Sequence, residues 1–223
     1  MKDASLSKST LARRGRAALA SGLLALMAIN PGLSLAADAT APDTLIRELS
    51  QETVEAIKAD KAIQAGDLQR IVKLVDEKIM PHVDFDKTTR SAMGRHWNQA
   101  TPEQRERLKH EFKGLLLRVY AGALSQFKEQ TIRQLPLRPG ATDGGQVEIK
   151  TQIVGKGEPL QLNYSLEKSE AGVWKIWDFN VLGASMVQTY RNPFAQEVGA
   201  NGIEGLIKML AEKNSKKPLP AKA

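Results

Sequence analysis

The sequence predicts an α+β fold in which helices come first, an antiparallel sheet of about four strands follows, and helices close the chain. Two observations carry this prediction. Apolar residues recur at helical spacing from Pro42 to about Phe127, and they alternate with polar residues after Phe127. Short turns that contain Gly or Pro separate the alternating segments, and such turns join neighbouring strands in antiparallel order.

The first helical region contains clear start signals. Apolar stripes run over residues 45–57 and 68–79, and Asp67 is the expected cap of the second stripe. The segment 101–104 (Thr-Pro-Glu-Gln) combines a hydroxyl cap, a proline at the first helical position and a glutamine three residues after the cap. The helix that it opens carries apolar residues at helical spacing: Leu108, Phe112, Leu116, Val119, Ala123 and Phe127.

Aromatic residues are concentrated near the end of the sheet. Five of the eleven aromatic residues lie between 173 and 194: Trp174, Trp177, Phe179, Tyr190 and Phe194. Strand alternation predicts that Trp177 and Phe179 share one face with Val173 and Val181, while Trp174 and Ile176 occupy the other face. The helix after the strand presents Met186, Tyr190 and Phe194 on one side. These groups converge on one volume, which is either ordinary core, favoured by the pattern alone, or the wall of a ligand cavity.

Residues 1–36 have the order of a secretory signal peptide: basic residues, the apolar run Ala17–Ile29, and the small-residue stretch Ser34–Ala36. The apolar run is shorter than the roughly 20 residues of a membrane-spanning helix, which favours a cleaved signal over an uncleaved anchor. We therefore expect a single domain at 37–212 and a disordered basic tail at 213–223.

Charge and composition exclude several classes of protein. The net charge is +7, but positions 1–36 hold five basic residues and one acidic residue, so the remainder carries +3. We therefore expect no nucleic-acid partner, because such proteins gather Lys and Arg on one face. The sequence has no cysteine, which excludes thiol catalysis and thiolate metal sites. No later segment is long and apolar enough to span a bilayer, so we expect no stable membrane insertion.

One segment could carry polar chemistry. His82, Asp84 and Asp86 could place an imidazole and a carboxylate on one side of an extended segment, as a metal site or an acid/base pair requires. The alternative, which we favour, is that His82 ends one helix and that Asp84 or Asp86 caps the next. The sequence has no serine-nucleophile elbow, phosphate loop or dinucleotide fingerprint.

Three blocks, in this order behind an export signal, resemble one known family. They are "MPHVDFDKTTRSAMGRHW" (80–97), "ATPEQRERLKHEFKGLLLRVYAGAL" (100–124), and "VWKIWDFNVLGASMVQTYRNPF" (173–194) followed by "GIEGLIKML". The family is that of the MlaC-type periplasmic phospholipid-binding proteins, also called the toluene-tolerance family. The resemblance extends from about Thr44 to Leu210.

The resemblance implies a periplasmic carrier of glycerophospholipid. Such a carrier moves lipid between an outer-membrane lipoprotein–porin complex and an inner-membrane ABC transporter complex, and so maintains outer-membrane lipid asymmetry. The implied fold is a twisted antiparallel sheet with N- and C-terminal helices around an apolar pocket for the acyl chains. The implied protein is not an enzyme: it has no catalytic residue, metal or cofactor, and the bound phospholipid is cargo. We expect it to be a monomer.

With the resemblance, apolar side chains of the sheet and the neighbouring helices become candidate pocket residues. They are Leu116, Val119, Tyr120, Val147, Ile149, Leu162, Tyr164, Trp177, Phe179, Val181, Met186, Tyr190 and Phe194. Plain core is the alternative for each, because the sequence does not show which sheet face the pocket uses. Arg90, Arg95 and Arg191 are candidate mouth or docking residues. Pro193 departs from the Tyr-Arg-x-x-Phe helix of the family and predicts a kink, or a restart with Asn192 as cap.

Three hypotheses follow. A lipid carrier contains co-purifying phospholipid. A periplasmic protein-binding adaptor has the same aromatic residues as plain core and contains no lipid. A small α+β hydrolase or isomerase has a polar His or Asp inside its pocket, and His82 or Asp84 would be the candidates.

Overall fold

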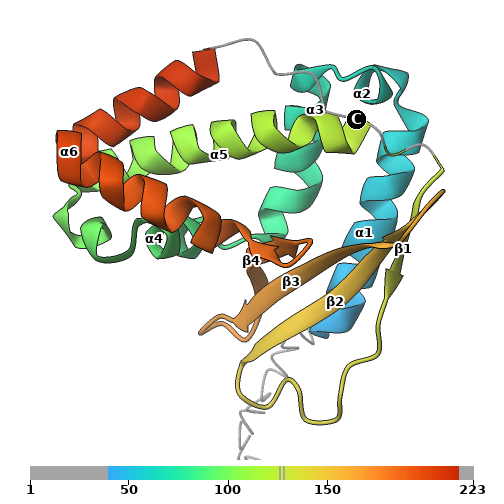
Figure 1. The fold of residues 1–223 in the computed structure, drawn as a ribbon. Helices are drawn as coiled ribbons and strands as arrows, with labels where there is room; N and C mark the ends of the chain where they lie inside the picture. The colour runs from blue at the N-terminus through green and yellow to red at the C-terminus, as the bar shows by residue number, and fades with distance from the viewer. Residues whose placement is uncertain (1–39, 126, 128, 216–223) are drawn as a thin grey trace, which may run out of the picture. The chain divides into compact units, whose positions relative to one another are not determined.

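Helices α1 to α5 precede a sheet, and a long C-terminal helix, α6, follows it (Figure 1). The structure is a computed structural model that describes residues 40–125, 127 and 129–215. The predicted signal segment, 1–36, and residues 216–223 of the predicted tail lie outside the described residues.

The element bounds follow the sequence patterns closely. The helical elements are α1 (Pro42–Ala59), α2 (Lys61–Gln64), α3 (Leu68–Leu74), the π-helical turn η1 (Val75–Ile79), the 3₁₀ turns η2 (Met80–His82) and η3 (Gly94–Gln99), α4 (Phe85–Met93), α5 (Pro102–Ser125) and α6 (Met186–Ser215). The strands are β1 (Thr131–Gln134), β2 (Gln146–Val154), β3 (Leu160–Lys168), β4 (Trp174–Val181) and β5 (Ala184–Ser185).

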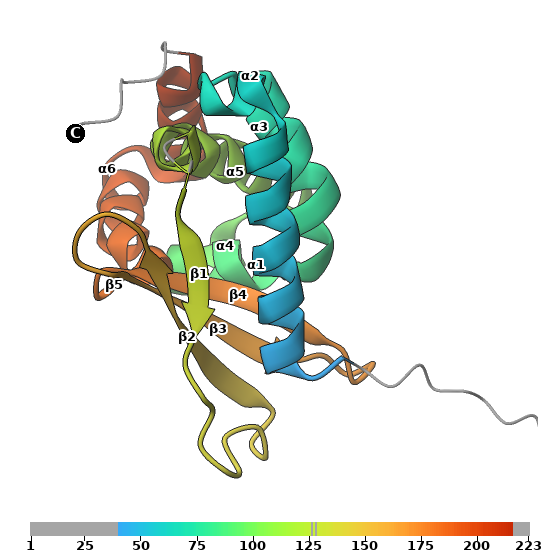
Figure 2. The same cartoon turned by 90° about the vertical axis from the view of Figure 1, so that its right-hand side faces the viewer.

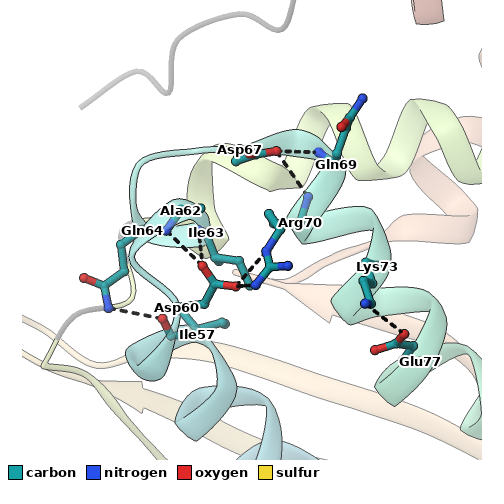
Figure 3. Close-up of polar contacts among 10 residues, drawn as sticks. All are labelled: Ile57, Asp60, Ala62, Ile63, Gln64, Asp67, Gln69, Arg70, Lys73 and Glu77. Carbon is teal, nitrogen blue, oxygen red and sulfur yellow. Dashed lines mark hydrogen bonds and ion pairs between the residues drawn. The ribbon is translucent and has the colours of Figure 1, made fainter.

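Side-chain caps fix the helix boundaries. Asp67 accepts hydrogen bonds from the backbone N–H groups of Gln69 (2.9 Å) and Arg70 (3.2 Å), which confirms it as the cap of α3 (Figure 3). Asp60 caps α2 and also accepts two bonds from the Arg70 guanidinium, at 2.9 and 2.6 Å. This carboxylate therefore ties the end of α1 to the start of α3.

The predicted start of α5 is also confirmed. The backbone N–H of Gln104 donates to the Thr101 hydroxyl (3.2 Å), and the backbone N–H of Thr101 donates to the Gln104 side chain (2.9 Å). This reciprocal pair satisfies two backbone donors at the helix start. It holds the N-terminal end of the 24-residue helix that runs above the sheet in both views (Figures 1 and 2).

The sheet is antiparallel, and its five described strands lie in sequence order, β1-β2-β3-β4-β5. This confirms the predicted α+β class. The fifth strand, a two-residue segment before α6, is too short to show as an alternating pattern. Helix α1 lies against the sheet (Figure 2), and Leu45, Ile46 and Leu49 of α1 form one buried cluster with residues of β2, β3 and β4.

A β-bulge in β4 changes which residues face the helices. Leu166 of β3 pairs with Ile176, whereas Tyr164 pairs with Phe179, so β4 contains one extra residue between these pairs. Leu166 and Tyr164 are two residues apart and share a face, and their partners Ile176 and Phe179 therefore also share a face. The prediction that these two side chains lie on opposite faces is wrong, because the extra residue of the bulge interrupts the alternation of side chains between the two faces of the sheet.

Helix α6 is broken at Gly202 rather than at Pro193. Gly202 has φ 71° and ψ −176°, which no helical residue adopts, whereas the backbone stays helical through Pro193. The predicted kink or restart at Asn192 is therefore wrong. Pro193 leaves the carbonyl of Thr189 without its helical donor, and both residues are exposed, so water can replace the missing bond. The helix also continues to Ser215, so the first three residues of the predicted tail are helical.

Candidate functional site

A cavity of about 290 Å³ lies between the sheet and the helices. Helices α1 and α5, the turn η1 and strands β1 to β4 supply most of its wall, and α4 and α6 add a few residues. The lining residues are Leu49, Ser50, Thr53, Val54, Ile57, Val75, Ile79, Met80, Val83, Phe85, Thr88, Lys113, Leu116, Leu117, Tyr120, Ala123, Leu124, Phe127, Ile132, Ile153, Leu162, Tyr164, Ile176, Trp177, Asp178, Phe179 and Met186.

The cavity surface is almost entirely apolar. The Thr88 hydroxyl lies within hydrogen-bond distance of the carbonyl oxygens of Trp177 (2.7 Å) and Asp84 (3.0 Å). The Lys113 ammonium pairs with Asp76 at 3.0 Å. The buried hydroxyl of Thr53 has no hydrogen-bond partner among the described residues. Such a surface suits a hydrocarbon, and apart from the Thr53 hydroxyl it offers a polar ligand few hydrogen-bond partners.

Asp178 is the buried carboxylate of the lining, and hydrogen bonds from β4, β5 and α6 hold it in place. One of its oxygens accepts the backbone N–H groups of Phe179 (2.9 Å) and Val187 (3.0 Å), and the other accepts the Ser185 hydroxyl (2.5 Å). Val187 lies in the first turn of α6, where the helix dipole favours a negative charge. The carboxylate thus anchors α6 to β4 and presents no free acceptor to the cavity.

Burial keeps the phenols near the cavity neutral. Burial raises the pKa of Tyr164 to about 12, although a hydrogen bond from Ser50 acts in the opposite direction. Burial also raises the pKa of Tyr120, with the nearby Asp178 charge adding to the effect. Both groups stay protonated at any physiological pH, so they add no charge to the lining.

The lining is most exposed on the C-terminal half of α5. Ala123 is the most exposed of the described lining residues, and Val119, one turn earlier, is 52% exposed. Leu160, which begins β3, and Leu182, which follows β4, are 47% and 65% exposed.

Lys113 is the first residue of α5 in the cavity lining. Ten residues of α5 separate it from Ala123, and a rise of 1.5 Å per residue makes this about 15 Å. Phe112, the residue before it, contacts Phe85 of α4 with ring centroids 5.8 Å apart. The rings of Tyr120 and Phe179 meet at 5.5 Å and link α5 to β4.

The structure brings seven of the thirteen predicted residues together on the cavity wall. They are Leu116, Tyr120, Leu162, Tyr164, Trp177, Phe179 and Met186. Trp177 is held in place from both sides: Thr88 binds its carbonyl, and the Lys87 ammonium lies 4.9 Å from its ring centroid. Lys87 also pairs with Glu167, so α4 is tied to both β3 and β4 at this point.

The other six predicted residues lie outside the lining. Val147 and Ile149 are on the inner face of β2, but α1 covers them there and makes them plain core. Tyr190 and Phe194 pack instead against Phe112 between α5 and α6, at ring-centroid distances of 5.1 and 5.0 Å. Val119 is more than half exposed on α5, and Val181, at the end of β4, is half-buried beside the turn to β5.

None of the lining residues before residue 101 is among those predicted from the sequence. Leu49, Thr53 and Ile57 belong to the apolar stripe of α1, and Val75 and Ile79 come from η1. The stripes were visible as helical periodicity. Periodicity shows which face is buried, but not whether a neighbouring element fills the space against it.

The candidate arginines lie away from the lining. Arg90, Arg95 and Arg191 are exposed and surround Gly94, at the junction of α4, η3 and α6. The Arg191 guanidinium covers Gly94 closely, because a Cβ built on that glycine would lie 3.3 Å from Nε of Arg191. None of the three belongs to the cavity lining.

The candidate acid/base side chains His82, Asp84 and Asp86 are also outside the lining, although Val83 and Phe85 between them belong to it. Asp84 caps α4 by accepting the backbone N–H of Lys87 (2.8 Å), and Asp86 pairs with Lys109 (3.3 Å). His82 ends η2, and burial lowers its pKa, as does the charge of Lys175. Within 40–125, 127 and 129–215, no group of three or more His, Asp or Glu side chains is arranged to hold a metal ion.

A sequence model of the family described as "MlaC protein" matches residues 47–212. The chain belongs to the MlaC family. This confirms the resemblance stated from the three sequence blocks. No helix in the described part of this family member is long and apolar enough to cross a membrane.

Individual relatives agree with the family assignment. The toluene tolerance protein Ttg2D of Pseudomonas putida is 29% identical over 183 residues, which is 81% of this chain and 83% of the relative. The intermembrane phospholipid transport system binding protein MlaC of Haemophilus influenzae is 23% identical over 179 residues, 79% of this chain and 83% of the relative.

A solved structure is similar over most of the fold. It is the phospholipid-binding protein from Ralstonia solanacearum in complex with a phospholipid, with a TM-score of 0.74 and 40% identity. The similarity covers 78% of this chain and 96% of the Ralstonia chain.

Proposed function

We propose that this protein is a phospholipid carrier that encloses acyl chains in the cavity between α1, α5 and the sheet. The observation that carries the proposal is the apolar cavity itself, in which the charged groups of Lys113 and Asp178 and the hydroxyl of Thr88 are directed to protein partners. Membership of the MlaC family and the similarity to a protein solved with a phospholipid support the choice of cargo.

The energetics of lipid transfer explain why a carrier needs such a wall. Two acyl chains of about 15 methylenes each, at about 0.8 kcal/mol per methylene, cost more than about 20 kcal/mol to expose to water. An apolar cavity makes transfer from a membrane nearly neutral. The head group stays outside in water, and no covalent bond has to be made or broken.

Loading requires the wall to move. A volume of about 290 Å³ is at the lower end of the roughly 300–1,000 Å³ that small-molecule sites span. A phospholipid with two chains is larger than most ligands of such sites. We infer that the side chains of the wall separate when cargo enters, while the length of the cavity along α5 is retained.

The route of the cargo is part of the same proposal. Residues 1–36 act as a cleaved signal that exports the domain 37–212 to the periplasm. There the carrier exchanges glycerophospholipid with an outer-membrane lipoprotein–porin complex and an inner-membrane ABC transporter complex, and it acts as a monomer. The three exposed arginines around Gly94 are candidate docking residues for these complexes.

The test is to purify the mature protein, residues 37–223, from a periplasm without detergent. Native mass spectrometry followed by organic extraction then counts the bound lipid. We expect one phospholipid with two chains per protein, and a mature N-terminus close to Ala37. Protein that is free of lipid and also takes none from vesicles would reject the carrier and favour the protein-binding adaptor.

A further inference from the structure

We propose that the side chain of Lys113 forms the closed end of the cavity and so sets the length of acyl chain that the protein encloses. The inference rests on the proposed carrier function, because it concerns how that carrier selects among its cargoes. It assigns to Lys113 a role in specificity, not in catalysis or in head-group recognition.

The contacts of Lys113 suit an end wall. It is the only basic side chain of the described cavity lining, and its ammonium is held outward by Asp76 of η1 at 3.0 Å. The side chain is 30% exposed, so its charged tip reaches solvent while its methylenes border the cavity. An acyl chain that reached this point would meet an apolar stem, and beyond it an ion pair.

The geometry sets the orientation and the length. We place the opening at Ala123, the most exposed of the described lining residues, so the head group remains at that end and the chain terminus points toward Lys113. The two residues are about 15 Å apart along α5. Each carbon of an extended chain advances about 1.25 Å, since bonds of about 1.5 Å meet at tetrahedral angles. About 12 carbons therefore fit between the opening and the end wall.

A fixed end wall has a measurable consequence. Each methylene that enters the cavity raises the affinity about fourfold. Once a chain reaches Lys113, further methylenes either stay outside or break the ion pair with Asp76, and the affinity stops rising. A plot of affinity against chain length therefore reaches a plateau, and the plateau position reports the end of the cavity.

The chain supplies a matched control on the same helix. Lys109 lies one turn before Lys113 and also pairs with carboxylates, Asp86 at 3.3 Å and Glu106 at 2.7 Å. Lys109 is outside the cavity lining. Its replacement removes a lysine and an ion pair from the same surface without changing the wall.

The experiment measures the affinity of delipidated mature protein for lysophosphatidylglycerols with 8 to 18 carbons, by calorimetry below each critical micelle concentration. We expect the wild type and Lys109→Ala to reach a plateau near 12 carbons. Lys113→Ala removes three methylenes of the wall, so its plateau should move to about 15 carbons. For a ligand two carbons longer than the wild-type plateau, its affinity should exceed that of the wild type about 16-fold. Lys113→Met keeps the length of the stem without the charge and should keep the wild-type plateau.

The opposite change gives an independent test. Lys113→Trp fills the end of the cavity and should move the plateau to shorter chains. Equal plateaus in the wild type, Lys113→Ala and Lys113→Trp would overturn the inference, as would an equal shift in Lys109→Ala. A uniform loss of affinity at all lengths in Lys113→Ala would overturn it too, since it would place the head group at Lys113. A wild type that binds no member of the series would reject the carrier function itself.

Discussion

Two leucines on one strand distinguish the wall of an empty cavity from packed core. Leu162 and Leu166 lie four residues apart on β3 and share a face of the sheet. Leu166 is fully buried in the cluster that α1 forms with the sheet, whereas Leu162 lines the cavity. The same substitution, leucine to alanine, therefore removes the same atoms from two different environments.

The expected costs differ several-fold. Leu166→Ala leaves a new void in a packed core, which costs about 2–5 kcal/mol of unfolding free energy. Leu162 already borders empty space and has fewer neighbours to lose, so we expect Leu162→Ala to cost about 1 kcal/mol. With about 2–4 °C per kcal/mol for a domain of this size, the midpoints of thermal unfolding should fall by roughly 4–20 °C for Leu166→Ala and 2–4 °C for Leu162→Ala.

Lipid affinity should respond in the reverse order. Leu162→Ala removes atoms that contact cargo and should weaken lipid binding about fivefold, whereas Leu166→Ala should leave the affinity of the folded fraction unchanged. Urea unfolding of the delipidated proteins and lipid titration at low temperature measure the two effects. If Leu162→Ala destabilises the delipidated protein as much as Leu166→Ala, the cavity is filled in solution and the argument from its wall fails.

Three further predictions concern the frame around the cavity. Asp178→Ala should cost about 3 kcal/mol of unfolding free energy in urea, because it leaves two backbone N–H groups and a hydroxyl without their buried acceptor. Asp67→Ala removes an exposed cap and should cost about 1 kcal/mol in the same assay. Equal costs for the two variants would contradict the anchoring role of Asp178. Gly94→Ala should cost about 1–3 kcal/mol of unfolding free energy, because Gly94 has φ 56° and ψ −133° and an added Cβ would crowd Arg191. Adding Arg191→Ala to Gly94→Ala should recover only the part of this cost that comes from the crowding. Burial lowers the pKa of His82 below its usual 6.5, so the unfolded chain binds more protons than the folded protein, and stability should fall as the pH drops through 6.5 toward the folded pKa. His82→Gln should remove this part of the pH dependence in unfolding curves measured between pH 7.5 and 5. An unchanged pH dependence in His82→Gln would show that His82 is not its source.

Local signals in the sequence were sufficient for most of the fold. The caps at Asp67 and Thr101 and the change from helical spacing to alternation after Phe127 depend on residues close together in the chain, and the structure retains them. The break in α6 shows the limit of such signals. Proline lowers the stability of a helix interior, but the backbone of α6 stays helical through Pro193, and the non-helical backbone falls on Gly202 instead.

The candidate site was harder to predict because it depends on contacts between distant elements. Val147 and Ile149 satisfy every sequence criterion for a pocket residue, yet α1 covers them. Tyr164 lies beside Ile149 on the neighbouring strand and reaches the cavity. Ile149 is core and Tyr164 is cavity wall because of where α1 crosses the sheet. The residue patterns of β2 and β3 do not predict that position.

The bulge in β4 connects these observations to the cavity. Without the extra residue between the Ile176–Leu166 and Phe179–Tyr164 pairs, Ile176 and Phe179 would face opposite sides of the sheet. With it, Ile176 packs under α1 and Phe179 meets Tyr120 of α5, so one strand contacts both helices that form the wall. Trp177, at the bulge, is fixed by Thr88 and Lys87 of α4. The strand is thus tied to α1, α4 and α5 at three separate points. These contacts fix the positions of the helices, so that between the contact points the helices do not pack directly on the sheet and the cavity remains.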